Sequence, residues 1–250
     1  MAWFFTQAFT GKSYTIMGED AKHIEKSLRM KIGEAITLVD DNSMQHSCVI
    51  EDISPNNVTV NVIESFPCEN EPDVKVTLYQ ALPKGDKMDT IIQKAVELGV
   101  TDIVPVISAR CISRPDEKSM AKKIQRWQKI ALQAAQQSRR GIIPQVKQMQ
   151  TFNQAVGGID ESQCNIIFYE CGGDSIGSVI DKGNKQINMF VGSEGGFEQQ
   201  EVQKVIDKKG YALTLGKRVL RAETAPLAGL AVIMYVTGNM DSIPTDKTFA

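Results

Sequence analysis

The apolar residues change their spacing part-way along the chain, and this change limits the possible folds more than any other feature. Up to about residue 65 they fall in short β-rich runs, with turn residues such as Ser54-Pro55-Asn56-Asn57 between them. From residue 74 onward, strand-like runs alternate with amphipathic helical segments. A chain of 250 residues can hold two such parts. We therefore expect a small β-rich domain followed by an α/β domain with a mostly parallel sheet.

The first part has the pattern of a small β-barrel or sandwich. Strands are expected at 35–41, 46–53 and 58–64, with one short helix at about 19–30. The stretch 66–73 contains two prolines and three acidic residues, which is typical of a linker. It predicts domains at 1–70 and 71–250.

The second part has the pattern of repeated βαβ units. The expected strands are 74–82, 102–107, 165–170, 187–192 and 211–216, and the expected helices are 86–99, 117–138, 198–210 and about 225–237. In an open α/β sheet, ligands bind at the carboxyl ends of the strands. The loops that follow residues 80, 170, 191 and 215 are therefore the candidate functional loops.

The composition argues against several classes of protein. No apolar run reaches the roughly 18 residues of a membrane helix, and the N-terminus lacks the basic and long apolar regions of a signal peptide. Five scattered cysteines with no CxxC pair indicate reduced thiols and a cytoplasmic protein. Only two histidines, His23 and His46, are present, so we expect no metal site.

The charge is unevenly distributed although the net charge is only −2. Residues 1–70 hold 5 basic and 10 acidic residues, whereas residues 84–147 hold 13 basic and 6 acidic residues. A basic block of this kind can contact phosphates, but charge alone favours the simpler interpretation of solvated helix faces.

Three loops at strand ends have residues suited to holding a ligand. GSEGGF at 192–197 is glycine-rich and lets backbone approach a ligand closely, although it matches neither a dinucleotide fingerprint nor a phosphate-binding P-loop. GKRVLRAETAP at 216–226 places cations and Glu223 before a helix, with Thr224 as its expected N-cap and free N–H groups at the helix start. Pro83-Lys84-Gly85 forms a basic turn before another helix.

Four segments in this order resemble one known family. LPKGDKMDTIIQKAVELGV, RWQKIALQAAQQSRR, GSEGGF and LGKRVLRAETA are similar to segments of the bacterial 16S ribosomal RNA uridine-N3 methyltransferases, which belong to the SPOUT superfamily. DAKHIEKSLRMKIGEAITLVD resembles the PUA-like β-barrel domain of that family. The resemblance covers essentially the whole chain. One departure is Ser193, where the family usually has proline.

The resemblance implies a PUA-like β-barrel followed by a SPOUT α/β domain with a trefoil knot, acting as a homodimer. It implies that the loops around 169–173, 192–197 and 215–225 form the knot and hold S-adenosylmethionine. The final helix, with Ala228, Gly229 and Ala231, is an expected part of the dimer interface. The implied cofactor-binding residues are Tyr169, Gly192, Ser193, Glu194, Gly195, Gly196, Leu215, Gly216, Val219, Leu220, Arg221, Thr224 and Ala225.

The implied reaction transfers a methyl group to N3 of a uridine in 16S rRNA, within the small ribosomal subunit. Because N3 must lose a proton before it attacks, a nearby cation would stabilise the resulting anion. We expect Arg221 to do this or to hold a phosphate, and Glu223 to orient Arg221 or to accept a proton. The expected RNA-contacting cations are Arg29, Lys31, Lys84, Arg110, Arg114, Arg139 and Arg140.

Three alternatives are compatible with parts of the sequence. A SPOUT methyltransferase can act on another base or another RNA, and the same fold can serve as a non-catalytic RNA-binding assembly factor. A nucleotide- or NAD-binding α/β enzyme is disfavoured because its fingerprints are missing. Cofactor binding measured by calorimetry separates the enzyme from the non-catalytic factor.

Overall fold

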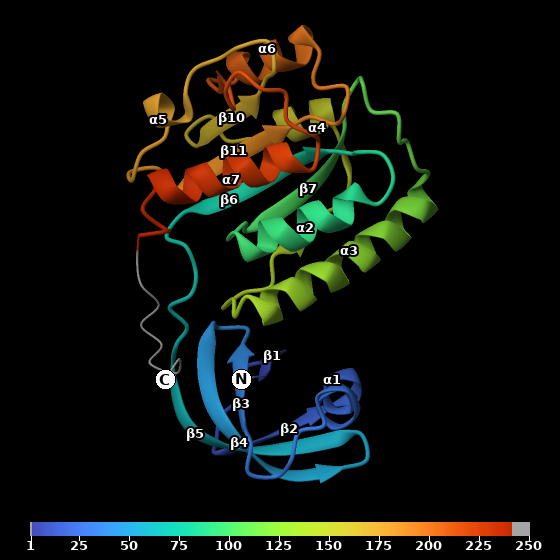
Figure 1. The fold of residues 1–250 in the computed structure, drawn as a ribbon, viewed down its shortest axis with the longest axis vertical. Coiled ribbons are helices and arrows are strands. Elements are labelled where there is room, and N and C mark those ends of the chain that lie inside the picture. Colours follow the sequence, from blue (N-terminus) through green and yellow to red (C-terminus); the bar gives the residue numbers. More distant parts are fainter. Residues whose placement is uncertain (1, 242–250) are drawn as a thin grey trace. The chain divides into compact units, whose positions relative to one another are not determined.

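The computed structural model describes residues 2–241, which form two compact units (Figure 1). One unit contains the chain up to Glu71 together with Ala135–Ile142, and the other contains Pro72–Ala134 and the chain from Ile143 onward. Within the described residues, no helix combines the length and the apolar character that a membrane span requires.

The N-terminal unit is a curled five-stranded sheet with the strand order β1-β3-β4-β5-β2 (Figure 1). Its strands are β1 (Ala2–Thr6), β2 (Ser13–Met17), β3 (Ala35–Asp40), β4 (Met44–Ser54) and β5 (Asn57–Pro67). β1 pairs with β3 in parallel, and the other pairs are antiparallel. Two register shifts in the long β4–β5 hairpin bend the strands, as bulges do, so that the sheet curls around an apolar core.

The sequence predicted three of these five strands. β3, β4 and β5 lie where strands were expected, and Asn56 has the left-handed conformation that the predicted turn favours. β1 and β2 were missed. The expected helix at 19–30 is α1 (Gly18–Lys22) followed by a π-helical turn, η1 (His23–Leu28).

The C-terminal unit is built on a parallel sheet with the order β12-β10-β11-β6-β7-β8, and β9 pairs with β7. Every strand pair in it is parallel. The strands are β6 (Lys75–Ala81), β7 (Asp102–Ile107), β8 (Gln145–Val146), β9 (Gln150–Thr151), β10 (Cys164–Phe168), β11 (Gln186–Val191) and β12 (Tyr211–Leu213). This confirms the predicted mostly parallel α/β domain.

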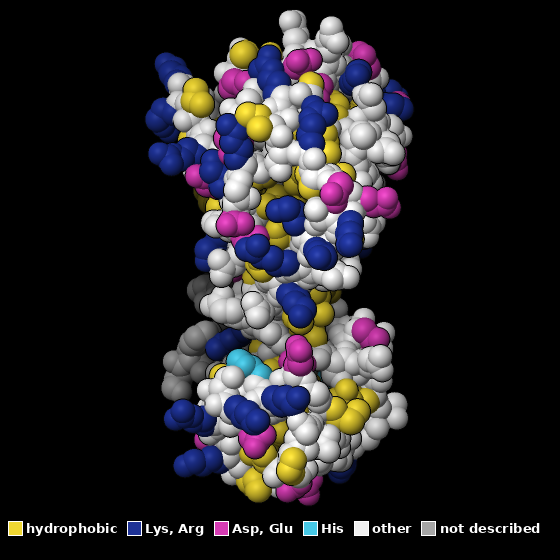
Figure 2. Space-filling view, turned by 90° about the vertical axis from the view of Figure 1, so that its right-hand side faces the viewer, with side chains coloured by type: hydrophobic (Ala, Val, Ile, Leu, Met, Phe, Trp, Pro, Cys, Tyr) yellow, Lys and Arg dark blue, Asp and Glu magenta, His cyan; other side chains and the backbone are white. Residues whose placement is uncertain are grey.

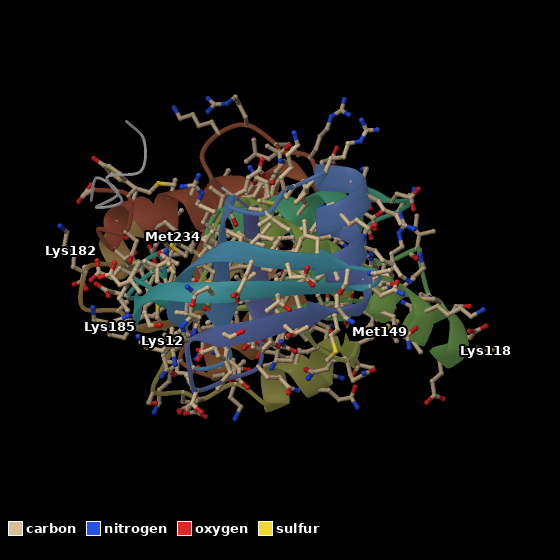
Figure 3. The ribbon with its side chains drawn as sticks, turned by 90° about the horizontal axis from the view of Figure 1, so that it is seen from below. Lys12, Lys118, Met149, Lys182, Lys185 and Met234 are labelled. Atoms are coloured by element: carbon tan, nitrogen blue, oxygen red, sulfur yellow. The ribbon has the colours of Figure 1, made fainter. Side chains whose placement is uncertain are left out.

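Helices cover the parallel sheet of the C-terminal unit. They are α2 (Lys87–Glu97), α3 (Glu117–Gln137), α4 (Phe152–Gly157), α5 (Ile176–Val179), α6 (Gln199–Asp207) and α7 (Thr224–Val236). α2 packs against α7, and α6 packs against α4, β10 and β12. Figure 3 labels Met234 of α7, whose side chain lies close to Gly99 just after α2.

One residue of α7 has a different role from the expected one. Gly229 lies against the ring of Phe168 in β10, and a side chain at position 229 would collide with that ring. The small residue therefore allows α7 to approach the sheet of its own chain, and Gly229 is buried rather than available to a second copy. Ala228 and Ala231 are only half-buried.

Candidate functional site

A pocket of about 520 Å³ opens at the carboxyl edge of the parallel sheet of the C-terminal unit. Its walls come from the segments that follow β10, β11 and β12, and from Lys87 at the start of α2, which follows β6. Three of the four predicted loops therefore contribute to one pocket, and the helix that follows the fourth contributes Lys87, because the carboxyl ends of neighbouring parallel strands meet at the same edge.

The glycine-rich turn after β11 is folded back tightly on itself. Gly196 N–H donates to Ser193 O at 3.0 Å, and Gly196 has a φ of +64°, a conformation that glycine adopts without strain. A side chain at position 196 would collide with the carboxylate of Glu170, which lines the same pocket. The glycines are therefore needed for the shape of the turn and for its close contact with the segment after β10.

Side chains from two other segments hold this turn from outside. Gln80, buried at the end of β6, donates from Nε2 to Gly192 O at 3.2 Å. Arg110, in the loop after β7, donates from Nη1 to Gly195 O at 3.0 Å. Carbonyl oxygens of the turn are therefore engaged by donors that approach from β6 and β7, and the turn has its shape without a ligand.

Lys87 joins two of the segments that form the pocket. Its Nζ lies 2.8 Å from Glu194 Oε1 in the glycine turn and 3.2 Å from Glu223 Oε2 at the start of α7. Only the contact with Glu194 has the geometry of a hydrogen bond, because Glu223 Oε2 satisfies no hydrogen-bond criterion. We call this cluster of Lys87, Glu194 and Glu223 the lysine clasp.

The charges of the lysine clasp shift the pKa values of its members. The hydrogen bond to Glu194, followed by the contact with Glu223, raises the pKa of Lys87. Burial raises the pKa of Glu194, but its hydrogen bonds to Lys87 and to backbone N–H groups outweigh burial and leave the pKa below its usual value. A backbone hydrogen bond and Lys87 lower the pKa of Glu223. All three groups are therefore charged at neutral pH.

The loop between β12 and α7 forms the other wall of the pocket and is much more open. Gly216 has a φ of +94°, and Val219 is 87% exposed. Within residues 2–241, positions 217–220 make no hydrogen bond and no ion pair. Leu215, Gly216, Val219, Leu220 and Arg221 line the pocket, and their contact with the cofactor stays a prediction.

The start of α7 differs from the prediction. Its N-cap is Glu223, with no side-chain capping bond, and Thr224 is the first helical residue. The N–H groups of Thr224 and Ala225 both donate to Arg221 O at 2.9 Å, so they are not free to hold a ligand. Ala225 lines the pocket, and Thr224 does not.

Tyr169 and Ser193 bring polar groups to the pocket. A hydrogen bond with the Cys171 thiol, followed by burial, raises the pKa of the Tyr169 phenol, which therefore stays protonated at neutral pH. Ser193 Oγ is buried and has no hydrogen-bond partner among the described residues. A buried polar atom without a partner is costly, so this hydroxyl is available to a bound molecule.

Comparison with known proteins identifies the family of this chain. Residues 69–234 match the model of an RNA methyltransferase domain, and residues 16–63 match that of an RNA methyltransferase PUA domain. The chain belongs to the RNA methyltransferase family. It is 34% identical over 233 residues to the ribosomal RNA small subunit methyltransferase E of Bacillus subtilis, covering 90% of this chain and 91% of the relative.

Two solved structures share the whole fold of this RNA methyltransferase. The enzyme of the same name from Neisseria gonorrhoeae, bound to S-adenosyl methionine, has a TM-score of 0.86 and 32% identity, covering 94% of this chain and 97% of that chain. A Legionella pneumophila protein described as a methyltransferase, with bound SAM, has a TM-score of 0.84 and 29% identity, covering 94% and 96%. The α/β class and the two-part architecture are thus confirmed, whereas the knot stays a prediction.

The cations expected to meet RNA are differently placed in this RNA methyltransferase. Arg29 and Lys31 are exposed on the N-terminal unit, and Lys84, Arg110 and Arg114 are exposed on the C-terminal unit. Figure 2 shows one face of the molecule, on which Lys and Arg side chains alternate with acidic ones. The exposed cations in the C-terminal unit follow β6 and β7, at the edge of the sheet where the pocket opens.

Arg139 and Arg140, two of the residues expected to contact RNA, lie beside Asn70 and Glu71. Arg140 is only 3% exposed and donates from Nε to Glu71 Oε1 at 2.9 Å and from Nη2 to Glu71 Oε2 at 2.6 Å. The prediction of an RNA contact for Arg140 is therefore wrong, because its guanidinium is buried in an ion pair. Arg139 is half-buried, and its carbonyl accepts a hydrogen bond from Asn70.

Sequence reasoning missed three residues that shape the pocket: Gln80, Lys87 and Glu170. Gln80 is a polar residue within an apolar strand, and it is fully buried. A buried amide must find partners, so its position in the strand was a usable signal. Lys87 and Glu170 lie within segments already singled out, but no spacing along the chain pairs them with Glu194, Glu223 or Gly196.

Proposed function

We propose that this chain transfers a methyl group from S-adenosylmethionine to N3 of a uridine in the 16S rRNA of the small ribosomal subunit. The observation that carries the proposal is one pocket, formed by the glycine turn and the loop before α7. The chain is similar along its length to a ribosomal RNA methyltransferase bound to S-adenosyl methionine and to a second ribosomal RNA methyltransferase. A ribosomal RNA substrate implies work in the cytoplasm.

The pocket suits S-adenosylmethionine in size and chemistry. A volume of about 520 Å³ lies in the range of small-molecule sites. Phe168, Val191 and Leu215 give it apolar walls, and the glycine turn exposes backbone groups at close range. The unpartnered hydroxyl of Ser193 adds a buried polar group for a ligand. When bound, the cofactor supplies a methyl group on a positively charged sulfur.

Arg221 is the residue to which we assign stabilisation of the uracil anion. It lines the pocket and is exposed, so a bound base or phosphate can reach its guanidinium. A guanidinium beside the uracil ring favours the form that has lost the N3 proton, which is the form that attacks. Replacement by alanine should lower kcat at saturating RNA by about tenfold or more, and Arg221→Lys should recover part of the activity.

Glu223 acts on Arg221 rather than as a strong base in this proposal. Arg221 stands close enough to contribute to the lowered pKa of Glu223. A carboxylate with a lowered pKa is ionised at neutral pH, but it is a weak acceptor for the N3 proton. Of the two roles expected from the sequence, orientation of Arg221 is therefore favoured. Glu223→Gln should then reduce kcat without changing its dependence on pH.

RNA binding is assigned to the exposed cations. Lys84, Arg110 and Arg114 stand at the edge of the sheet where the pocket opens, and Arg29 and Lys31 are on the PUA-like domain. Replacing a lysine or arginine that contacts a phosphate reduces the dependence of RNA affinity on salt by about one unit of slope. A variant of Arg110 or Lys84 with an unchanged slope would remove that residue from the RNA contact.

The proposed assembly is a homodimer that uses α7. Val232 and Tyr235 are 39% and 65% exposed on a helix that is otherwise strongly apolar, and Ala228 and Ala231 lie half-buried on it. Exposed apolar residues on one helix are suited to a second copy of the chain. Light scattering should give twice the mass of the chain, and Tyr235→Glu should shift it toward one copy.

The proposed activity is tested with labelled S-adenosylmethionine and small ribosomal subunits that lack the modification, with free 16S RNA in parallel. Methylation of N3 blocks the Watson–Crick edge, so reverse transcription should stop one nucleotide before the modified uridine. Labelling without such a stop would move the reaction to another atom or RNA. Absence of both labelling and cofactor binding in calorimetry would favour a non-catalytic RNA-binding factor.

A further inference from the structure

A second pocket lies near the first in the C-terminal unit and shares no lining residue with it. It has a volume of about 300 Å³ and is formed by the loop after β7 and by the starts of α4 and α6. Glu201 of α6 is buried and joins these walls, because its Oε1 accepts from Ala109 N–H at 2.9 Å and its Oε2 from Glu198 N–H at 3.0 Å. The pocket is thus a defined part of the fold.

The two pockets are neighbours at the same edge of the sheet. The first lies at the carboxyl ends of β10, β11 and β12, and the second at the carboxyl end of β7. Arg110 connects them, because it belongs to the loop that walls the second pocket and donates to Gly195 O in the glycine turn of the first. The space for a side chain on Gly195 is already filled by Arg110, whose Cβ would lie 2.9 Å from an added Cβ. A ligand long enough to cross this contact can occupy both pockets.

The lining of the second pocket suits a nucleobase. The buried ring of Phe152 gives it an apolar surface, and the amide side chains of Asn153 and Gln200 offer donors and acceptors. Asn153 Oδ1 accepts from Lys204 Nζ at 2.8 Å, which orients the amide so that its NH₂ group remains for a ligand. Asparagine and glutamine side chains recognise base edges through paired hydrogen bonds of this kind.

Arg114 adds a guanidinium group to the lining of the second pocket. Arg114 is fixed by three carbonyl acceptors: its Nε donates to Cys111 O at 3.3 Å, and its Nη2 donates to Ala109 O at 3.1 Å and Ser108 O at 3.5 Å. Its Nη1 group keeps two N–H donors, and the side chain is exposed. The lining also includes the carboxylates of Glu198 and Glu201, which repel a phosphate, so the pocket is not suited to a phosphate group. Its amide and guanidinium groups are suited to hydrogen bonds with a base.

We propose that the second pocket binds the base of an RNA nucleotide adjacent to the one that is methylated. This inference rests on the proposed function, because the RNA must lie across the edge of the sheet at which the first pocket opens. It assigns Asn153 and Gln200 to base recognition and Arg114 to the same nucleotide from the rim. The pocket would then contribute to the choice of the modified site.

The test compares two glutamines on one helix. Gln200 lines the pocket, whereas Gln203 lies outside it and donates to Asp207 at 2.9 Å. Gln200→Ala combined with Asn153→Ala should raise the KM for RNA by about five- to tenfold, while Gln203→Ala leaves it unchanged. Calorimetry should give the same S-adenosylmethionine affinity for all variants.

RNA sequence provides the sharper measurement. RNA substrates that carry each of the four bases next to the methylated nucleotide should differ in KM with the wild-type protein. The double variant should lose most of these differences. An equal KM shift for every base, or an equal shift in Gln203→Ala, would overturn the inference even if methylation proceeds normally. Loss of cofactor binding or of methylation in the wild-type protein would instead contradict the proposed function.

Crosslinking gives an independent readout that does not require activity. A photoreactive amino acid at position 153 should crosslink to a nucleotide within a few residues of the modified uridine, and the same group at position 203 should not. Crosslinks from position 153 that map only to distant RNA, or none from it, would place the RNA elsewhere and overturn the inference.

Discussion

The two loops that face each other across the first pocket are held in opposite ways. The glycine turn, 192–197, is held by Gln80, Arg110 and the lysine clasp, and it packs against Glu170. In the loop 216–222, residues 217–220 make no hydrogen bond and no ion pair with any described residue. One wall of the pocket therefore has its shape before a ligand arrives, and the other is free to adapt to it.

This difference bears on how affinity is divided between the walls. A rigid wall loses little conformational entropy on binding, whereas a loose loop must be ordered, which costs about 1–2 kcal/mol per residue fixed. The glycine turn should therefore determine how tightly the cofactor is held. The loop before α7 should determine how fast the cofactor enters and how the pocket closes over it.

The largest effect is expected from Gly196→Ala. The new Cβ collides with the carboxylate of Glu170, and alanine at a φ of +64° adds strain of about 1–2 kcal/mol. Because the turn is held on several sides, it cannot relax, and S-adenosylmethionine affinity should fall by roughly 30-fold, or about 2 kcal/mol. Calorimetry measures this. Unchanged affinity would show that the turn is not held as described.

Removal of the lysine clasp should have the next largest effect. Lys87→Met keeps the length of the side chain but leaves Glu194 and Glu223 facing each other without a cation. Since the group is partly exposed and therefore screened, we expect about a fivefold loss of cofactor affinity. Lys94→Met is the matched control, because Lys94 pairs with Glu97 on the same helix and is not part of the pocket lining. Equal effects of the two variants would mean that the clasp contributes only to general stability.

Gly216→Ala should have a smaller effect than Gly196→Ala, although both glycines have positive φ. No atom lies within 4 Å of an added Cβ at position 216, where φ is +94°. The strain can relax into residues 217–220, which no hydrogen bond to a described residue holds, so the expected loss of affinity is about threefold. An effect as large as that of Gly196→Ala would mean that the loop before α7 is as rigid as the glycine turn.

Val219→Ser should change cofactor affinity by less than about twofold if Val219 stays exposed when the cofactor binds. The side chain is 87% exposed, so little burial is lost unless the loop closes over the ligand. Stopped-flow measurement of cofactor release distinguishes a loop that stays open from one that closes over the cofactor. A faster release with little change in the entry rate would indicate that Val219 becomes covered on binding.

The smallest effect is expected from pH near neutrality. The lowered pKa values of Glu194 and Glu223 keep these carboxylates ionised until the pH falls well into the acidic range. The raised pKa of Lys87 keeps it charged until the pH is strongly alkaline. The lysine clasp therefore contributes throughout the interval from about pH 6 to about pH 9 and is lost only outside it. Calorimetric affinities across that interval should agree, and a clear trend would assign the titration to another group.

The sequence predicted the framework of the site better than its internal contacts. Periodicity located most strands and the helices α2, α3, α6 and α7, and parallel pairing then implied that the loops after them share one edge. Periodicity needs several residues, so β8, β9, α4 and α5, which have between two and six residues, left no usable pattern. Resemblance to a family, rather than spacing, suggested the cofactor.

Pairings between distant residues were beyond the reach of local patterns. Lys87 meets Glu194 and Glu223 across more than a hundred residues of chain, and nothing in the local sequence of Arg140 indicates that Glu71 buries it. The same limit explains the wrong cap at Thr224. A threonine before an apolar helix is a common cap, but here the helix begins one residue earlier than expected, so Glu223 occupies the cap position and Thr224 is already helical.

The ion pair between Arg140 and Glu71 also bears on how this protein can be divided or recombined. The N-terminal unit is made from two separate pieces of chain, since Ala135–Ile142 belongs to it. Within that short piece, the carbonyl of Arg140 accepts from Trp3 Nε1 at 3.0 Å, and Gly141 N–H donates to Glu71 Oε1 at 2.7 Å. A fragment cut after residue 71 would leave these groups unmatched. A PUA-like domain that is moved to another protein by itself would therefore lack Ala135–Ile142. These eight residues belong to its fold but lie within the methyltransferase part of the sequence.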